Sequence, residues 1–280
     1  MMGDRDLSED VVQHQYFEAS PIPVPEMDEG TREMGPLYPF VISGGTNTER
    51  YYFIHINDIT NYKFNIIPKY FGEEASYPEV FPERIKDIIK KNVGAKIFCV
   101  FDLDVVFRNK TNQKNHREFL ERIGGEINNG SVVLCPSMPC IEYWFLLHYE
   151  NYTDLIQSCG AKMQRLLKPH MIPLFPDAEK KLLNLLKDKK YIEDPSWVIA
   201  LCADGKLELA IKRAEDNIYA AIAANDLENH SFSYVYKVFK EYQYPIPHFN
   251  EHGLVVYTNP ARELNSANYE TGSLSKQFFY

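Results

Sequence analysis

Four acidic residues follow apolar runs of the sequence, in positions that suit metal-assisted chemistry. Asp102 and Asp104 come directly after the apolar run 96–101, and Glu49 and Glu142 each lie shortly after another such run. Two carboxylates about 4 Å apart repel each other by roughly 4 kcal/mol at an effective dielectric near 20. A fold that brings them together usually supplies a cation, and an oxygen-only ligand set favours Mg²⁺ or Mn²⁺.

Each acid also has a purely structural explanation. Thr46 and Glu49 have the spacing of a capping box, and an Asp-x-Asp after a strand can cap the next loop. From spacing alone, metal binding and capping remain equally open.

The elements that must position these acids alternate between strands and helices. Strands are predicted at residues 39–43, 63–68, 96–101 and 131–135, and helices at 46–59, 82–91, 115–123 and 137–148. This order predicts an α/β fold with a mostly parallel sheet flanked by helices. Ligands of such sheets bind outside the carboxyl ends of the strands, where we expect the four acids to meet.

The rest of the chain divides by composition. Residues 1–36 are expected to form an acidic, flexible arm, because nine acidic and two basic side chains give residues 1–35 a charge of −7 out of a total of −9. The α/β domain is expected at 37–150 and an irregular tail at 244–280. Residues 151–243 form a predicted helical region, with helices at 152–167, 177–190, 206–223 and 231–242.

Composition also bounds the class of protein. A hydrophobic fraction of 45% excludes intrinsic disorder of the whole chain. The most apolar stretch is too short to span a bilayer of roughly 30 Å, and the acidic start of the chain does not resemble a secretory signal. The five cysteines contain no Cys-x-x-Cys pair. We therefore expect a soluble, cytoplasmic protein with no membrane partner.

A basic stretch surrounds the two aspartates, since residues 84–117 hold nine basic and three acidic side chains. Such a stretch suits the binding of a polyanion. The residues expected to neutralise substrate phosphates are Lys96, Arg108, Lys110 and Lys114. Gly45 and Thr46 precede a predicted helix, so their backbone N–H groups could also bind a phosphate.

Three motifs resemble those of the RloB-like family. Residues 43–53, SGGTNTERYYF, resemble its Gly-x-x-Thr-Glu-x-x-Tyr-Phe opening, and Asp102-Leu103-Asp104 stands at its Asp-x-Asp. Residues 137–148, SMPCIEYWFLLH, resemble its Asn-Pro-Cys-Phe-Glu-x-Trp-Leu-Leu-Leu-His segment. The match covers about residues 37–150. The resemblance implies a fold similar to TOPRIM domains, the Mg²⁺-binding modules of topoisomerases, primases and OLD-type nucleases.

That family is found in bacterial restriction and phage-defence loci, often beside an ABC-type ATPase. The resemblance implies a hydrolase: a Mg²⁺- or Mn²⁺-dependent nuclease effector of abortive infection that cleaves phosphodiesters of DNA, tRNA or other RNA. Glu49, Asp102 and Asp104 would bind the metal, and Glu142 would be a further ligand or a general base. His148 would either be a core residue or support the site from behind the ligands, packed near Trp144. The implied partners are nucleic acid and an ABC- or OLD-type ATPase.

One position departs from the related pattern. TOPRIM proteins usually place a Glu directly before the first Gly, where this chain has Ser43. Together with the net negative charge, this favours an alternative reading. In that alternative the chain is a catalytically degenerate TOPRIM-like subunit that binds, and is regulated by, a partner ATPase.

Overall fold

The computed structural model describes residues 38–45, 47–69, 77–175 and 179–242, together with the backbone of two strands at 246–249 and 255–258. Its first half consists of β1 (Phe40–Ser43), α1 (Thr48–Ile59), β2 (Asn65–Ile67), α2 (Phe81–Lys91), β3 (Ile97–Asp102), α3 (Leu103–Phe107), α4 (Lys110–Arg122), α5 (Gly124–Asn128), β4 (Val132–Met138) and α6 (Ile141–Leu147). The second half consists of α7 (Ala161–Met171), α8 (Leu182–Leu185), α9 (Lys189–Ile192), α10 (Ser196–Cys202), α11 (Lys206–Ala223), β5 (Phe232–Ser233), α12 (Tyr236–Lys240), β6 (Ile246–Phe249) and β7 (Val255–Thr258).

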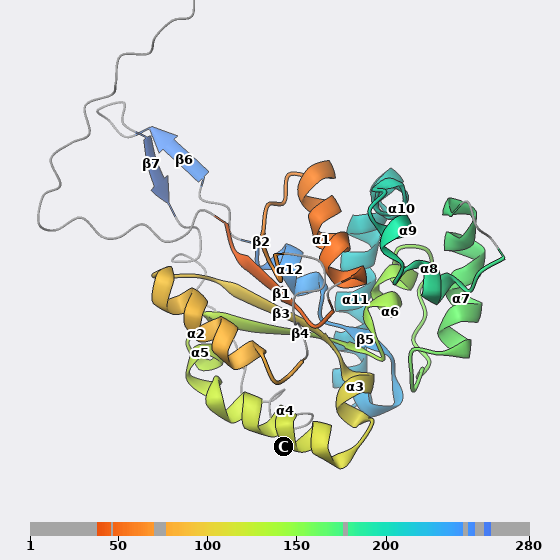
Figure 1. Cartoon of the computed structure of the whole chain (residues 1–280), viewed down its shortest axis with the longest axis horizontal. Helices are drawn as coiled ribbons and strands as arrows, with labels where there is room; N and C mark the ends of the chain where they lie inside the picture. The colour runs from red at the N-terminus through yellow and green to blue at the C-terminus, as the bar shows by residue number, and fades with distance from the viewer. Residues whose placement is uncertain are drawn as a thin grey trace, which may run out of the picture. The chain divides into compact units, whose positions relative to one another are not determined.

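The central sheet has the strand order β2-β1-β3-β4-β5 (Figure 1). β1 pairs in parallel with both β2 and β3, and β3 pairs in parallel with β4. β5 is antiparallel to β4. The predicted α/β fold with a mostly parallel sheet flanked by helices is therefore confirmed.

Helices cover both faces of this sheet, with α2 and α4 on one side and α1, α6 and α12 on the other (Figure 1). On the α2–α4 side, the ring of Tyr77 stacks on Phe101 at a centroid distance of 3.9 Å. On the opposite side, Trp144 of α6 stacks on Phe239 of α12 at 5.8 Å. The Trp144 indole N–H also donates to the hydroxyl of Tyr52 at 2.9 Å. Aromatic packing on this second side thus fixes α1 and α6, which carry Glu49 and Glu142.

The alternation of β3 sets the direction of the first aspartate. Residues 97–101 of this strand are all buried, and Phe101 packs against the α2–α4 side. Successive side chains of a strand point to opposite faces. Asp102, the last residue of β3, therefore faces the side of α1 and α6.

Several predicted elements have different bounds in the structure. The helix predicted from Ser137 begins at Ile141 because β4 continues to Met138. The helix predicted at 115–123 begins earlier, at Lys110, because the side chain of Asn109 caps it. The helix predicted at 206–223 has the same bounds in the structure.

The helical region differs most from its prediction. The helix predicted at 152–167 begins only at Ala161, because the preceding segment is extended and the Ile156 N–H donates to the Ser231 hydroxyl at 2.8 Å. The helix predicted at 177–190 is two short helices, α8 and α9, and Asp188 caps the second. The helix predicted at 231–242 contains the strand β5 and the shorter α12.

The helical region is built onto the sheet. β5 extends the sheet beside β4, and the hydroxyls of Ser137 and Ser233 are hydrogen-bonded at 2.8 Å. The described residues from Tyr38 onward belong to one compact unit, so the division near residue 150 stays a prediction. Inside the predicted irregular tail, β6 and β7 pair antiparallel. The predicted N-terminal arm lies outside the described residues.

Every helix within the described ranges is too short or too polar to cross a bilayer.

Candidate metal centre

The strand order places the acids at a topological switch point. From β1 the chain passes through α1 to β2 on one side, and from β3 it passes through α4 to β4 on the other. The carboxyl ends of β1 and β3 therefore adjoin where the two connections diverge, which is the usual ligand site of open α/β sheets. Asp102 ends β3, and Glu49 is the second residue of α1.

A tight loop folds Glu49 back over the end of the sheet. The Gly44 N–H donates to the carbonyl of Val100 at 2.8 Å, and the Ser43 hydroxyl donates to the carbonyl of Gly45 at 2.8 Å. A Cβ atom on Gly45 would overlap both carboxylate oxygens of Glu49. Only a glycine leaves room for Glu49, which is buried here.

The expected capping box is not formed by the described residues. Asn47 is the residue before α1, and its side chain makes no capping hydrogen bond. It donates instead to the carbonyl of Lys187 at 2.9 Å. Glu49 accepts a hydrogen bond from its own backbone N–H. Thr46 lies outside the described residues.

Asp102 connects β3 to the start of α6. Its Oδ1 accepts the N–H of Ile141 at 2.9 Å, which is one of the N–H groups a helix leaves unpaired at its first turn. This contact fixes the residue next to Glu142. Oδ1 of Asp102 thus positions the start of α6, and its other oxygen, Oδ2, could bind a ligand.

Cys159, in the loop before α7, makes hydrogen bonds to two of the acids. Its backbone N–H donates to Oδ2 of Asp104 at 3.0 Å, and its thiol donates to Oε2 of Glu142 at 3.3 Å. Glu142 is only 2% exposed. Glu49, Asp102, Asp104 and Glu142, called the acid cluster from here on, are close enough for the charges of the other three to act on Asp102.

Burial and mutual repulsion destabilise the ionised form of Glu49 and of Asp102 in this cluster. Burial, followed by the charges of Glu49, Glu142 and Asp104, raises the pKa of Asp102 well above its usual value. Burial also raises the pKa of Glu49 to about 7; its own N–H lowers it, Glu142 raises it further, and Lys187 lowers it. The cluster therefore has a surplus of negative charge that a divalent cation would neutralise.

Lys187 is a charged neighbour of the acid cluster that the sequence reasoning missed. It lies at the surface between α8 and α9. Partial burial lowers the pKa of its ammonium, but the charges of Glu142, Cys159, Glu49 and Asp102 outweigh this effect and raise the pKa. Its main chain is held at α1, because the Thr48 hydroxyl also donates to the carbonyl of Leu186 at 2.6 Å.

The donor chemistry of the cluster suits a hard divalent cation, although among the described residues Glu49, Asp102 and Asp104 do not bring three carboxylate oxygens within 4.8 Å of one another. Glu49, Asp102 and Asp104 offer carboxylate oxygens, which Mg²⁺ and Mn²⁺ prefer. Asp104, like Asp102, has one oxygen engaged by a backbone N–H and the other available. Glu142 offers a further carboxylate beside them.

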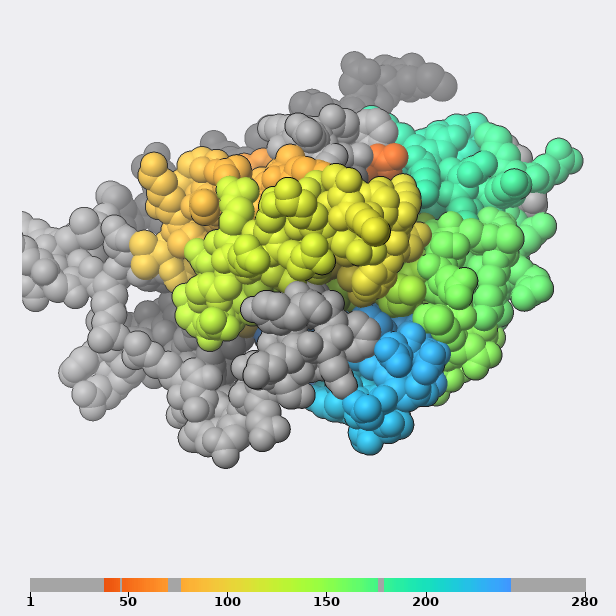
Figure 2. All heavy atoms as spheres, turned by 90° about the horizontal axis from the view of Figure 1, so that it is seen from below, coloured from red at the N-terminus to blue at the C-terminus, as the bar shows by residue number. Residues whose placement is uncertain are grey.

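The basic residues expected to bind phosphate are not all near the cluster. Lys96 precedes β3 at the opposite end of the sheet, where its ammonium lies 3.1 Å from Glu241. Arg108, Lys110 and Lys114 are exposed at the end of α3 and on α4. This surface borders the green surface around residues 150–170 (Figure 2).

His148 belongs to the core on the far side of α6. Its Nδ1 donates to the carbonyl of Leu201 at 2.7 Å, and its ring lies edge-on to Trp144 at 5.1 Å. Burial lowers its pKa to about 3, although the bond to Leu201 acts in the opposite direction. A role of His148 in the metal site stays a prediction.

Comparison with known proteins gives one family. The family model described as RloB-like protein matches residues 40–241, a segment that includes the acid cluster, Cys159 and Lys187. No curated protein and no solved structure matches the chain. Because the matched segment covers more than half of the sequence and holds the three motifs noted above, the chain belongs to the RloB-like protein family.

Proposed function

We propose that this protein is a divalent-metal-dependent phosphodiesterase with a TOPRIM-like site, which cleaves nucleic acid as an effector of bacterial phage defence. The observation that supports it most directly is the acid cluster at the switch point. Burial and the neighbouring carboxylates raise the pKa of both Glu49 and Asp102. A group of acids with this surplus of negative charge is suited to hold Mg²⁺ or Mn²⁺.

In this proposal some side chains would bind the ion, and neighbouring backbone groups orient them. Glu49, Asp102 and Asp104 would hold the ion, which when bound polarises a phosphate oxygen and lowers the pKa of water. Ile141 and Cys159 orient the two aspartates through their backbone N–H groups. The buried carboxylate of Glu142 would be a further ligand of the ion.

A hollow beside the loop of Cys159 includes cationic side chains, although most of its lining is apolar. It has a volume of about 550 Å³ and is lined by Gly160, Gln164, Arg165, Lys168 and Lys181, among others. Gly160 directly follows Cys159, which contacts the cluster. These cations and those of α4 would neutralise phosphates, so we expect the affinity for nucleic acid to fall steeply with salt.

A cleavage assay tests the proposal. DNA, RNA and tRNA are incubated with the wild type and with Asp102→Asn, in Mg²⁺ or Mn²⁺ and in chelator. We expect metal-dependent cleavage by the wild type and a loss on the order of 100-fold in Asp102→Asn. Asp216→Asn, which changes an exposed acid of α11, is the matched control and should retain activity. Equal cleavage by wild type and Asp102→Asn would refute the proposal.

Ser43 supports a second candidate function. This residue is fully buried and its hydroxyl serves the loop by binding the Gly45 carbonyl, so the position supplies no carboxylate to an ion. The protein would then be a regulated subunit of a partner ATPase. Copurification with a co-expressed ABC-type ATPase, combined with no heat of Mn²⁺ binding in calorimetry, would select this alternative.

A further inference from the structure

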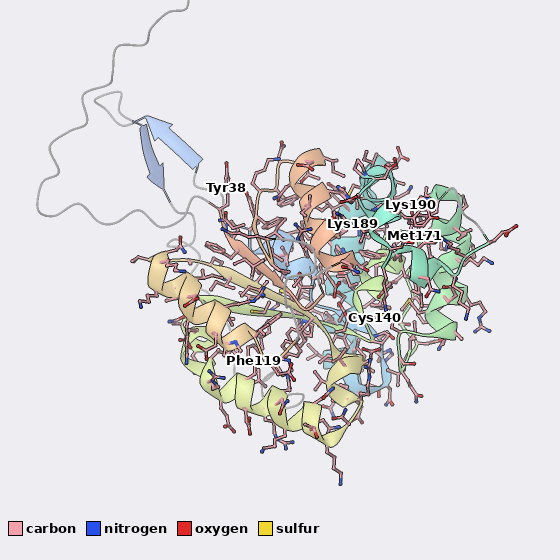
Figure 3. All side chains as sticks on the ribbon, viewed as in Figure 1. Tyr38, Phe119, Cys140, Met171, Lys189 and Lys190 are labelled. Atoms are coloured by element: carbon pink, nitrogen blue, oxygen red, sulfur yellow. The ribbon has the colours of Figure 1, made fainter. Side chains whose placement is uncertain are left out.

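Two thiols lie beside the acid cluster without a role in the proposed hydrolysis. Cys140 is the buried residue before α6 (Figure 3), and Cys159 lies in the loop before α7. Their thiols are hydrogen-bonded to each other. The Cys159 thiol also donates to Oε2 of Glu142 at 3.3 Å. One possible ligand atom from each of Cys140, Glu142 and Cys159 lies within 4.8 Å of the other two.

These distances fit a tetrahedral zinc ion. Zn–S bonds of about 2.3 Å and Zn–O bonds of about 2.0 Å place neighbouring ligand atoms roughly 3.5 to 3.8 Å apart at tetrahedral angles. The three ligand atoms need only small side-chain movements to reach that arrangement. A fourth position remains open for water, as in zinc sites with three protein ligands.

The chemistry of this set differs from that of the carboxylates. Thiolates are soft ligands that favour Zn²⁺, whereas carboxylates alone favour Mg²⁺ or Mn²⁺. We propose that Cys140, Cys159 and Glu142 form a second metal site of this protein, which binds Zn²⁺ beside the acid cluster. On binding, each thiol releases its proton to solvent, and the two thiolates and the carboxylate coordinate the ion.

The site would hold a loop of the proposed metal centre in place. The backbone N–H of Cys159 already donates to Asp104. An ion that joins Cys159 to Cys140 therefore fastens this loop to the start of α6, and with it the orientation of Asp104. Two thiolates and one carboxylate leave the zinc-bound group with one excess negative charge. Lys187, whose charge acts on Glu142 and Cys159, is placed to offset it.

Cobalt binding tests this site on the full-length chain. Reduced, metal-free protein is titrated with Co²⁺, because cobalt bound to thiolate gives a charge-transfer absorption that cobalt bound to oxygen lacks. We expect a single such Co²⁺ ion per chain, displaced stoichiometrically by Zn²⁺. Cys140→Ser and Cys159→Ser should each halve the absorption and weaken Zn²⁺ binding by about ten-fold or more. The double variant should lose the absorption.

Cys202→Ser is the matched control, because Cys202 is partly buried like Cys159 but lies at the end of α10. It should keep the full absorption. Circular dichroism checks the fold of each variant, and the wild-type titration decides the matter if a variant fails to fold. Absence of the absorption in the wild type, or its persistence in the double variant, would overturn the proposal. So would formation of a Cys140–Cys159 disulfide in place of metal binding.

The outcome is separable from that of the proposed function. An ion held by Glu49, Asp102 and Asp104 gives no thiolate absorption. A wild type that shows the cobalt absorption but no Mn²⁺-dependent cleavage would refute the phosphodiesterase and leave the zinc site standing. Cleavage without the absorption would refute the zinc site alone.

Discussion

Lys187 and Glu49 show how single side chains set the charge of the site. Lys187 lowers the pKa of Glu49, while burial raises it to about 7. The lysine thus supplies part of the positive charge that the cluster needs, but it does so as a monovalent group at the surface. It is a natural competitor of a divalent cation.

Removing the lysine charge should strengthen metal binding. For Lys187→Met we expect a Kd for Mn²⁺ that is roughly five-fold lower, equivalent to about 1 kcal/mol, because a like charge next to the ion is lost. Isothermal titration calorimetry measures it. Lys212→Met, which changes an exposed lysine of α11, should leave the Kd unchanged. A weaker or unaltered Kd in Lys187→Met would show that the lysine does not compete with the ion.

Among the elements, the loop between β1 and α1 is the most constrained part of the site. Gly45→Ala should displace the Glu49 carboxylate, because the added Cβ overlaps both of its oxygens. We expect Mn²⁺ binding to fall by about ten-fold or more with little change in the far-ultraviolet circular dichroism spectrum. Gly125→Ala is the control, since a Cβ there meets nothing within 4 Å. Retained Mn²⁺ affinity in Gly45→Ala would remove Glu49 from the ligand set.

Helix α6 joins the site to the core and makes stability depend on pH. Burial lowers the pKa of His148 to about 3 from its ordinary value of 6.5. Between these values the unfolded state binds more protons than the folded state, so stability is complete above pH 6.5 and is lost as the pH falls. From pH 6.5 to 5 this group should remove about 2 kcal/mol from the free energy of unfolding.

Urea denaturation at pH 7.5 and pH 5 measures this effect. His148→Asn should show a smaller decrease in the free energy of unfolding between the two pH values, by about 2 kcal/mol. For each protein, the free energy of unfolding at pH 5 is subtracted from that at pH 7.5. A loss of packing in the variant lowers both values equally and therefore cancels. Equal decreases in the wild type and the variant would show that His148 is protonated in the folded protein.

At the scale of the whole molecule, the helical region completes the core of the α/β part. Trp144 stacks on Phe239, and the Arg213 guanidinium donates to the carbonyl of Leu147 at 2.7 Å. A fragment of residues 38–150 should therefore show no cooperative unfolding in urea, whereas residues 38–242 should unfold in a single transition. A cooperative transition of the short fragment would instead support a domain boundary near residue 150.

The positions of the acids and the order of the sheet could be predicted because both depend on short, local patterns in the sequence. Asp102 and Asp104 follow a continuous apolar strand, and the order of strands and helices implies the edge at which they meet. Cys159 and Lys187 were missed because each lies inside a segment predicted as a continuous helix. Both helices are interrupted by contacts with distant residues, such as that of Ile156 with Ser231, and such contacts leave no local pattern.

The attachment of Lys187 to α1 has a kinetic consequence. Asn47 and Thr48 hold the carbonyls of Lys187 and Leu186, so the backbone below the lysine is fixed relative to the helix that carries Glu49. An ion that arrives from solvent can displace the ammonium by rotation of one flexible side chain, a picosecond-to-nanosecond event. Loading of the centre would then depend on the encounter and dehydration of the ion, without waiting for any slower rearrangement of the main chain.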